Sequence, residues 1–500
     1  MQYQSTRGAG CSKYTSAAAI SQGLASDGGL FAPDSFPTLT QNDINALIEK
    51  SYSERAAYVM SLFLADFTLD ELNQFSKSAY STNRDNGFYN DAIAPLYKFN
   101  DNTYFLELWH GPTCAFKDMA LQIMPRLLIK SLEKVGESRN VCILVATSGD
   151  TGKAALEGFC DIPGTKIMVF YPNDGVSEVQ ELQMTSQLGS NVNVVAIEGN
   201  FDDAQTGVKN IFADKEFCEE VDKMGYILSS ANSINVGRLI PQVAYYVSSY
   251  CDLVKNGEIE IGEKINFCVP TGNFGNILAA YYAERMGLPI NKLICASNSN
   301  DVLTQFITTG VYDKNRPFYT TVSPSMDILV SSNLERLLFE LSGKNGDVVS
   351  SYMSSLSADG IYSVDEKVRS ELNRIFDAGY CSEDDTKKTI KDTFDKHGYL
   401  IDTHTAVAYK VLNDYISKTG DDRITVVVST ASPFKFCEAV LESLGKKVIS
   451  NGIDLIYELS EETGCDVPAP LDSLKNCKSR FNDIVSVSEM SDVVKEFVEK

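Results

Sequence analysis

Hydrophobic and polar positions along the chain change their pattern near residue 95. Before that point, apolar residues recur with helical spacing, most clearly over 41–64, with turn signals at 27–29 and Pro33. After it, short β-rich apolar runs alternate with segments of helical spacing. The clearest runs are 141–146, 166–172, 193–198, 264–270 and 424–428. This alternation predicts α/β layers around parallel sheets, preceded by a mostly helical region over 1–95.

Composition narrows the classes of function. The 500 residues suffice for two or three domains with cores of their own. A formal net charge of −23 argues against nucleic acid and anionic membranes as partners, because both attract basic surfaces. No apolar run reaches the length of a membrane-spanning helix. The first residues lack the apolar core of a secretory signal, so we expect a cytoplasmic protein.

The cysteines and histidines indicate neither a disulfide scaffold nor a metal site. Twelve cysteines are scattered without a C-x-x-C pair, and several, such as Cys142 and Cys268, stand in apolar runs. We interpret them as buried thiols in a reducing compartment. Only three histidines are present, and no Cys/His cluster suggests zinc. We interpret His404 as structural, beside a helix cap at Thr403 or Thr405.

Lys117 is the strongest candidate for chemistry. It lies in the segment 109–122, WHGPTCAFKDMALQ, between Phe116 and Met119. Loss of hydration would lower the pKa of this lysine and free its amine for carbonyl chemistry. The alternative is a solvated surface lysine, which describes most lysines in proteins.

Three loops follow predicted strands, where ligands bind in open parallel sheets. In the first, TGNFGN over 271–276, Gly272 and Gly275 would let the backbone approach an anion at the start of a helix. This arrangement suits a phosphate monoester, although Gly and Asn also form ordinary turns.

The second and third loops offer hydroxyl groups. TSGDTG over 147–152, followed by Lys153, is not a P-loop, because Thr147 and Ala154 stand where Gly and Ser or Thr are required. It could line a cofactor, hold a substrate carboxylate or simply form a turn. In the third loop, 429–433, the Thr430 hydroxyl could meet a pyridine nitrogen, although spacing alone favours an ST-turn that caps the next helix.

Several segments occur in the same order as in threonine synthases: HGPTCAFKD, TSGDTGKAA, NSINVGR, PTGNFGNILA, DTHTAVA and STASPFKF. The chain therefore resembles that family over nearly its whole length. The resemblance implies a fold-type II pyridoxal-phosphate enzyme, with two parallel-sheet αβα lobes around the cofactor and a mostly helical N-terminal region. We expect the catalytic region over 96–500, with a smaller lobe at about 118–200 and a larger lobe from 96–117 and 201–500.

The resemblance also implies roles for single residues. Lys117 would carry pyridoxal 5'-phosphate as a Schiff base, and Thr430 would face its pyridine nitrogen. The cofactor phosphate would be held by Gly272, Asn273, Phe274, Gly275 and Asn276. Many members of the fold type have Asn in place of Asp150, and whether Asp keeps that residue's contact with the cofactor stays open. Candidates for substrate contact are Ser148, Asp150, Thr151, Lys153, Ser233, Asn235 and Arg238.

The reaction implied by the resemblance converts O-phospho-L-homoserine and water into L-threonine and phosphate, the last step of threonine biosynthesis. We expect that small molecule, rather than nucleic acid or a membrane, as the partner. Two alternatives stay open. One is another enzyme of the fold type, a serine/threonine dehydratase or a cysteine synthase. The other is a threonine-synthase-like protein that binds phosphorylated ligands without turnover.

Overall fold

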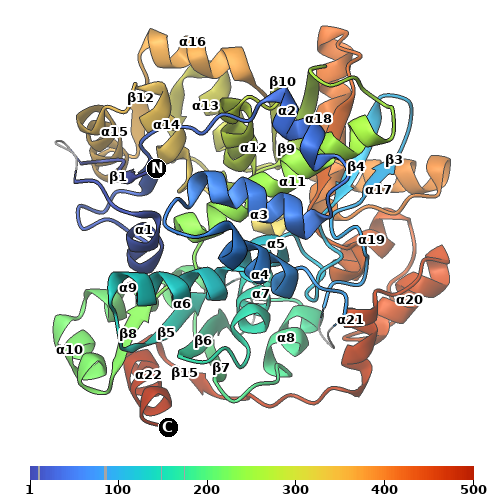
Figure 1. Ribbon diagram of the computed structural model, residues 1–500. Coiled ribbons are helices and arrows are strands. Elements are labelled where there is room, and N and C mark those ends of the chain that lie inside the picture. The colour runs from blue at the N-terminus through green and yellow to red at the C-terminus, as the bar shows by residue number, and fades with distance from the viewer. Residues whose placement is uncertain (9–11, 84–86, 148, 174) are drawn as a thin grey trace.

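The computed structural model describes residues 1–8, 12–83, 87–147, 149–173 and 175–500. Two larger sheets organise the fold, one of six strands and one of five. The five-stranded sheet lies in the lower part of Figure 1 and the six-stranded sheet in the upper part.

The N-terminal region is predominantly helical, as its spacing predicts. Its helices are α1 (Ser16–Gln22), α2 (Gln41–Leu47), α3 (Tyr52–Phe63) and α4 (Leu69–Ala79), beside the antiparallel pair β1 (Tyr3–Ser5) and β2 (Phe31–Pro33). The continuous apolar spacing over 41–64 is nevertheless divided between α2 and α3. Ser51 begins α3 with a capping box, in which its hydroxyl accepts from the Glu54 N–H and the Glu54 carboxylate accepts from the Ser51 N–H.

The six-stranded sheet has the order β13-β10-β9-β14-β4-β3, and all neighbours are parallel except β3 and β4. Its strands are β3 (Leu96–Lys98), β4 (Thr103–Glu107), β9 (Ile265–Pro270), β10 (Ile290–Ser297), β13 (Phe376–Tyr380) and β14 (Thr425–Ser429). Helices of this part are α11 (Val236–Lys255), α12 (Gly275–Met286), α13 (Val302–Thr309), α14 (Leu334–Leu341), α15 (Gly346–Ala358), α16 (Glu366–Ile375), α17 (Glu383–His397), α18 (Thr403–Thr419), α19 (Cys437–Ser443), α20 (Asp454–Thr463) and α21 (Ala469–Asp472). A small antiparallel pair joins β11 (Val311–Asp313) to β12 (Ile361–Ser363).

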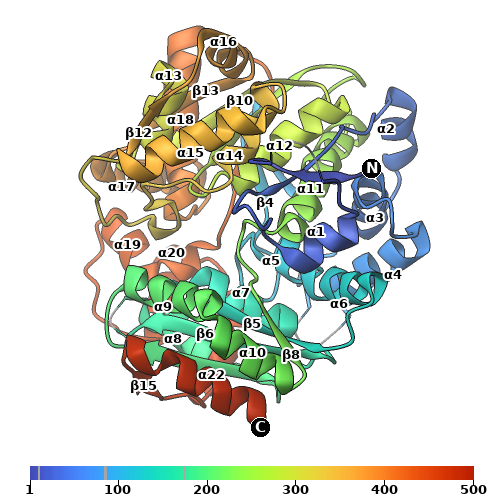
Figure 2. The same ribbon diagram turned by 90° about the vertical axis from the view of Figure 1, so that its left-hand side faces the viewer.

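The five-stranded sheet is entirely parallel, with the order β15-β7-β6-β5-β8. Its strands are β5 (Asn140–Ala146), β6 (Thr165–Pro172), β7 (Val192–Ile197), β8 (Tyr226–Ser229) and β15 (Ile484–Val485). Its helices are α6 (Met124–Val135), α7 (Asp150–Phe159), α8 (Glu178–Thr185), α9 (Phe201–Ala213), α10 (Lys215–Lys223) and α22 (Met490–Glu499). The C-terminal helix α22, red in Figure 2, lies beside α9 and α10.

The predicted lobe boundary at residue 200 does not follow the sheets. The chain beyond 200 returns to the five-stranded sheet twice, first as β8 beside β5 and then as β15 beside β7. Parallel pairing joins strands that are distant in sequence, so the apolar pattern of one segment does not show which sheet it enters.

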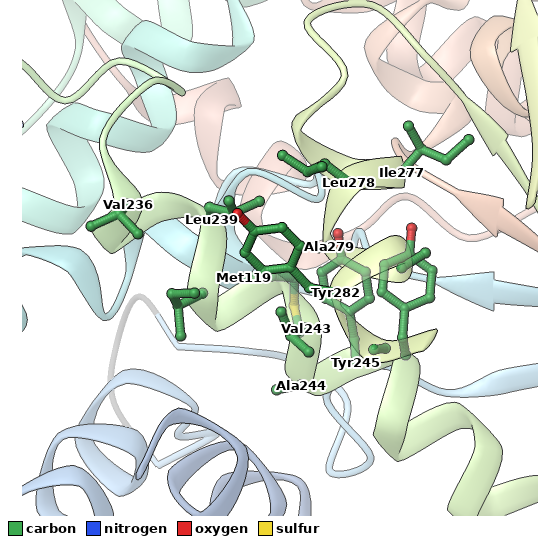
Figure 3. Close-up of a cluster of buried hydrophobic side chains, with 14 of the residues drawn as sticks. Met119, Val236, Leu239, Val243, Ala244, Tyr245, Ile277, Leu278, Ala279 and Tyr282 are labelled. Carbon is green, nitrogen blue, oxygen red and sulfur yellow. The ribbon is translucent and has the colours of Figure 1, made fainter. Parts of the chain in front are cut away.

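A buried cluster between α5 (Asp118–Leu121), α11 and α12 supports the segment that follows Lys117. Figure 3 shows Met119 from α5 among Leu239 and Val243 from α11 and Leu278 and Tyr282 from α12. All five side chains are at most 1% exposed. The short helix that begins after Lys117 is therefore anchored in the core.

The described residues can also be examined for disulfides, metal sites and membrane-spanning helices. Seven of the eleven described cysteines are buried, and all eleven are free thiols. In the described part of the chain, no three or more Cys, His, Asp or Glu side chains gather as a metal site would require. Among the same residues, none of the helices combines the length and apolar character needed to cross a membrane.

Candidate active site

Lys117 lies where two segments distant in sequence pair with each other. The Phe116 N–H donates to the Thr430 carbonyl at 2.8 Å, and the Ser432 N–H donates to the Cys114 carbonyl at 3.0 Å. Lys117 thus stands beside the loop after β14. The Thr430 hydroxyl makes no hydrogen bond within the described residues, and it is Ser432 that caps the following turn.

The spacing of the HGPT-x-AFKD segment has a structural reason. The Thr113 N–H and hydroxyl each donate to the buried Asp118 carboxylate at 2.8 Å, which folds the loop back onto the start of α5. A Cβ at Gly111 would lie 2.5 Å from that carboxylate, so glycine is required there. This loop fixes the backbone on both sides of Lys117.

The Lys117 amine is buried among charged and polar groups. Its Nζ lies 3.5 Å from the Ser325 hydroxyl and 3.8 Å from Asp150 Oδ2. Burial lowers the pKa of Lys117 to about 8; Asp150 opposes this effect, whereas Arg238 and Lys435 add to it. The predicted loss of hydration is confirmed, and neutral amine becomes accessible near physiological pH.

The loop after β9 presents hydrogen-bond donors. Phe274 precedes α12 with a left-handed φ of 61°, and no described side chain caps the first turn of that helix. The Asn276 amide oxygen accepts from the hydroxyls of Tyr245 and Tyr246 at 2.5 and 2.6 Å. Its buried Nδ2 has no partner among the described residues. An uncapped helix start and an unused buried donor suit a phosphate group.

The two glycines of this loop have different surroundings. A Cβ at Gly272 would lie 2.5 Å from the Ser325 carbonyl oxygen, whereas one at Gly275 would meet only Asn333 Nδ2, at 3.5 Å. The Asn273 carbonyl is itself held by the Asn333 N–H and side-chain amide. Close passage of the Ser325 backbone therefore requires glycine at position 272. The role of both glycines as openings for an anion stays a prediction.

Asp150 begins α7 in the loop after β5. Its Oδ1 lies 2.7 Å from Lys435 Nζ and accepts from Gln180 Nε2 at 3.0 Å, while Oδ2 faces Lys117. Burial opposes ionisation of Asp150, but the charges of Lys435 and Lys117 outweigh it and lower the pKa of the carboxyl. The carboxylate is thus held in place by protein groups.

Two substrate candidates already have partners within the protein. Lys153 Nζ contacts Glu157 at 3.0 Å and also bonds to the Gln187 side chain. The Asn235 amide accepts from the Gly237 N–H at 2.8 Å and donates to a carbonyl of α1, and thus begins α11. These side chains support local structure rather than a free anion site.

Arg238 is the candidate with unused donors. It is buried, one Nη donates to the Ala231 carbonyl at 2.8 Å, and its Nε has no partner among the described residues. Burial lowers the pKa of Arg238 to about 10. Ser233, which lies shortly before Arg238 in the sequence, and Thr151 are both partly buried, and Ser148 lies outside the described residues.

Ser325 and the support that His404 gives it were not predicted from the sequence. The Ser325 N–H donates to His404 Nε2 at 3.2 Å, and His404 Nδ1 donates to Asp402 at 2.8 Å. Asp402, rather than Thr403 or Thr405, begins α18. The structural interpretation of His404 agrees with its burial, but the histidine supports a residue that contacts Lys117.

Lys435 was also missed, although its sequence carries a usable signal. It lies between Phe434 and Phe436, much as Lys117 follows Phe116. The criterion of apolar flanks applied to Lys117 would have selected it too, and its side chain is fully buried.

Comparisons with known proteins agree along the chain. Residues 2–80 match the family model "Threonine synthase N terminus", 92–430 match "Pyridoxal-phosphate dependent enzyme" and 405–498 match "Threonine synthase, C-terminal". Threonine synthase from Pseudomonas aeruginosa is 42% identical, over 84% of this chain and 85% of that protein. Threonine synthase-like 1 from Homo sapiens is also 42% identical over 86% of this chain, which spans only 58% of that relative's length.

Solved structures give the same result. PLP-bound threonine synthase from Brucella melitensis matches with a TM-score of 0.88 at 38% identity, covering all of both chains. Yeast threonine synthase matches with a TM-score of 0.88 at 34% identity, covering 100% of this chain and 98% of the other.

The two larger sheets, the buried lysine between their loops and the family match together define a pyridoxal-phosphate-dependent enzyme of fold type II, which confirms the predicted class. Its cofactor is pyridoxal 5'-phosphate. The chain belongs to the threonine synthase family.

Proposed function

We propose that this protein converts O-phospho-L-homoserine and water into L-threonine and phosphate. The observation that carries the proposal is a buried lysine with a lowered pKa, in a chain that matches threonine synthases over nearly all its length. Its electrostatic setting suits a group that must exchange a proton near neutral pH.

The residues present fit pyridoxal 5'-phosphate. Lys117 would hold the aldehyde carbon and Thr430 would bond to the pyridine nitrogen. The phosphate would be held at the start of α12 by Gly272, Asn273, Phe274, Gly275 and Asn276. Within the described residues, the assignment is supported by the helix start that no side chain caps and by the buried Asn276 Nδ2, which has no partner there. When bound, the cofactor supplies an electron sink for charge that develops on the substrate.

The protein groups would supply the proton transfers and the binding of the substrate phosphate. The Lys117 amine, with a pKa of about 8, would accept and return protons at the substrate carbons. Arg238 would bind the substrate phosphate, because the Nε of its buried guanidinium has no partner in the part of the chain that the structure describes. Ser233 stays a weaker candidate for this contact, and Ser148, Asp150 and Thr151 stay candidates for contact with other parts of the substrate. Lys153 and Asn235 are disfavoured by their internal bonds.

Charge and cysteine chemistry support the proposed kind of substrate and the proposed cellular compartment. A net charge of −23 supports a small-molecule substrate rather than nucleic acid. Free thiols at all described cysteines support the predicted reducing cytoplasm.

A direct assay separates the proposed reaction from its alternatives. Purified protein incubated with O-phospho-L-homoserine should release phosphate and threonine in equal amounts, and Lys117→Ala should release neither. Formation of a 2-oxo acid and ammonia from serine or threonine, without threonine from phosphohomoserine, would indicate a dehydratase. Binding of phosphohomoserine with no product would favour the non-catalytic alternative, to which the relatives named Threonine synthase-like 1 draw attention.

A further inference from the structure

A buried ion pair joins the two sheets next to Lys117. Lys435 lies in the 3-10 turn η2 (Pro433–Lys435), after β14 of the six-stranded sheet. Asp150 follows β5 of the five-stranded sheet, and its Oδ1 lies 2.7 Å from Lys435 Nζ. The two side chains are 0% and 5% exposed. Because removing two charges from water is costly, such a pair is weak evidence for stability and invites a functional explanation.

The contacts of this pair give Asp150 a fixed orientation. Lys435 and Gln180 both engage Oδ1, which turns Oδ2 toward the Lys117 amine at 3.8 Å. Lys435 is held in turn, because it also donates to the Thr113 carbonyl at 2.9 Å. That carbonyl belongs to the loop that precedes Lys117, so the ion pair and the amine share one support.

The charged groups around Lys117 oppose one another. Asp150 and Asp118 favour its protonated form, whereas Arg238 and Lys435 disfavour it. Without Lys435, Lys117 would be the one other cation among the described residues that pairs with the buried Asp150 carboxylate. The amine would then retain its proton to higher pH.

We propose that Lys435 is a positioning residue that balances the Asp150 charge, so that the carboxylate faces Lys117 without holding its amine protonated. In this arrangement the Asp150–Lys435 pair acts as one neutral unit. The effect of this pair on turnover rests on the proposed function, whereas its effect on the protonation of the Lys117 amine does not.

The test compares Lys435→Met, Asp150→Asn and the double variant, all as full-length protein. Limiting acetic anhydride is applied to cofactor-free protein across a pH series, and Lys117 acetylation is measured by mass spectrometry. We expect the pH of half-maximal labelling to rise by roughly 1 in Lys435→Met and to fall by roughly 1 in Asp150→Asn. In the double variant it should return close to the wild-type value, because both charges are gone.

Thermal melts of the same proteins provide the second measurement. Each single variant leaves one buried charge without its partner and should melt at a lower temperature, whereas the double variant should recover much of the loss. The matched control is the pair Lys495–Glu220, which is 2.8 Å apart, close to the 2.7 Å of the buried pair, but has both side chains 41% exposed. Lys495→Met, Glu220→Gln and their double variant should change neither measurement.

Two results would overturn the proposal: unchanged Lys117 labelling in Lys435→Met, or a double variant that melts below both single variants. If wild-type protein turns over phosphohomoserine, Lys435→Met should lower kcat more than it raises KM, and the double variant should regain part of kcat. If wild-type protein does not, the proposed function fails while the labelling still decides the role of Lys435.

Discussion

At the scale of single residues, internal contacts distinguish two cations, Lys153 and Arg238, that the sequence offers as candidates for binding the substrate phosphate. Lys153 is bound to Glu157 and Gln187, whereas Arg238 leaves its buried Nε without a partner in the described residues. A buried charge with unused donors is costly unless a ligand completes its contacts. Arg238 is thus the better anion site.

Arg238→Met should therefore weaken substrate binding more than folding. Loss of a charged hydrogen bond should raise KM for phosphohomoserine roughly tenfold or more. The melting temperature should be unchanged or higher, because the variant removes an incompletely paired buried charge. Steady-state kinetics and thermal melts check both statements. Lys153→Met is the control: it should leave KM unchanged, and an equal rise in KM for both variants would contradict the assignment.

The sequence predicts Lys117 and the loops around it, but not how their charges are balanced. The apolar residues next to Lys117 in the segment 109–122 predict that this lysine is buried, as it is in the structure. The contact between Asp150 and Lys435 joins positions 285 residues apart, on loops of different sheets. No local pattern encodes such a pairing, because it is produced by the packing of the two sheets.

At the scale of elements, prediction succeeds where a strand is long and wholly apolar. The runs that predict β5 and β6 coincide with buried strands to within a residue. By contrast, β4, β8 and β10 were not predicted from the sequence, and β8 is only four residues long. Helix boundaries are also set by single residues, as Ser51 shows where it separates α2 from α3.

In the loop between β9 and α12, Gly272 and Gly275 differ in the space around them. Gly272→Ala would place its Cβ against the Ser325 backbone and should displace the segment that contacts Lys117. It should lower the melting temperature of cofactor-free protein by a few degrees, for a loss of roughly 1–3 kcal/mol. Gly275→Ala has room and should melt like wild type.

Cofactor titrations complete that comparison. Gly275→Asp brings a negative charge to the helix start and should weaken pyridoxal-phosphate binding severely without a comparable loss of stability. Wild-type affinity in Gly275→Asp would mean that the phosphate is bound elsewhere. Equal melting temperatures for Gly272→Ala and Gly275→Ala would contradict the different roles of the two glycines.

At the scale of the whole molecule, the C-terminal segment with β15 and α22 packs against the five-stranded sheet and its helices. The strand β15 adds only two residues to that sheet, and α22 covers α9 and α10 (Figures 1 and 2). Met490, Val494 and Val498 are buried in the apolar cluster on that face. The family resemblance suggests that this segment belongs to the larger lobe, and a two-residue strand has no sequence pattern that would have indicated otherwise.

Val494→Asp tests whether this C-terminal segment holds the smaller sheet together. Val494 is fully buried, so an aspartate there should destabilise the protein by about 3 kcal/mol or more. The site itself lies on other elements, so protein that stays folded at low temperature should bind pyridoxal phosphate with wild-type affinity. Urea unfolding and cofactor titration measure the two effects.

Glu496→Asp is the matched control, since it places the same side chain at an exposed position of α22 and should leave stability nearly unchanged. Equal stability of the two variants would show that α22 is not needed to hold the smaller sheet.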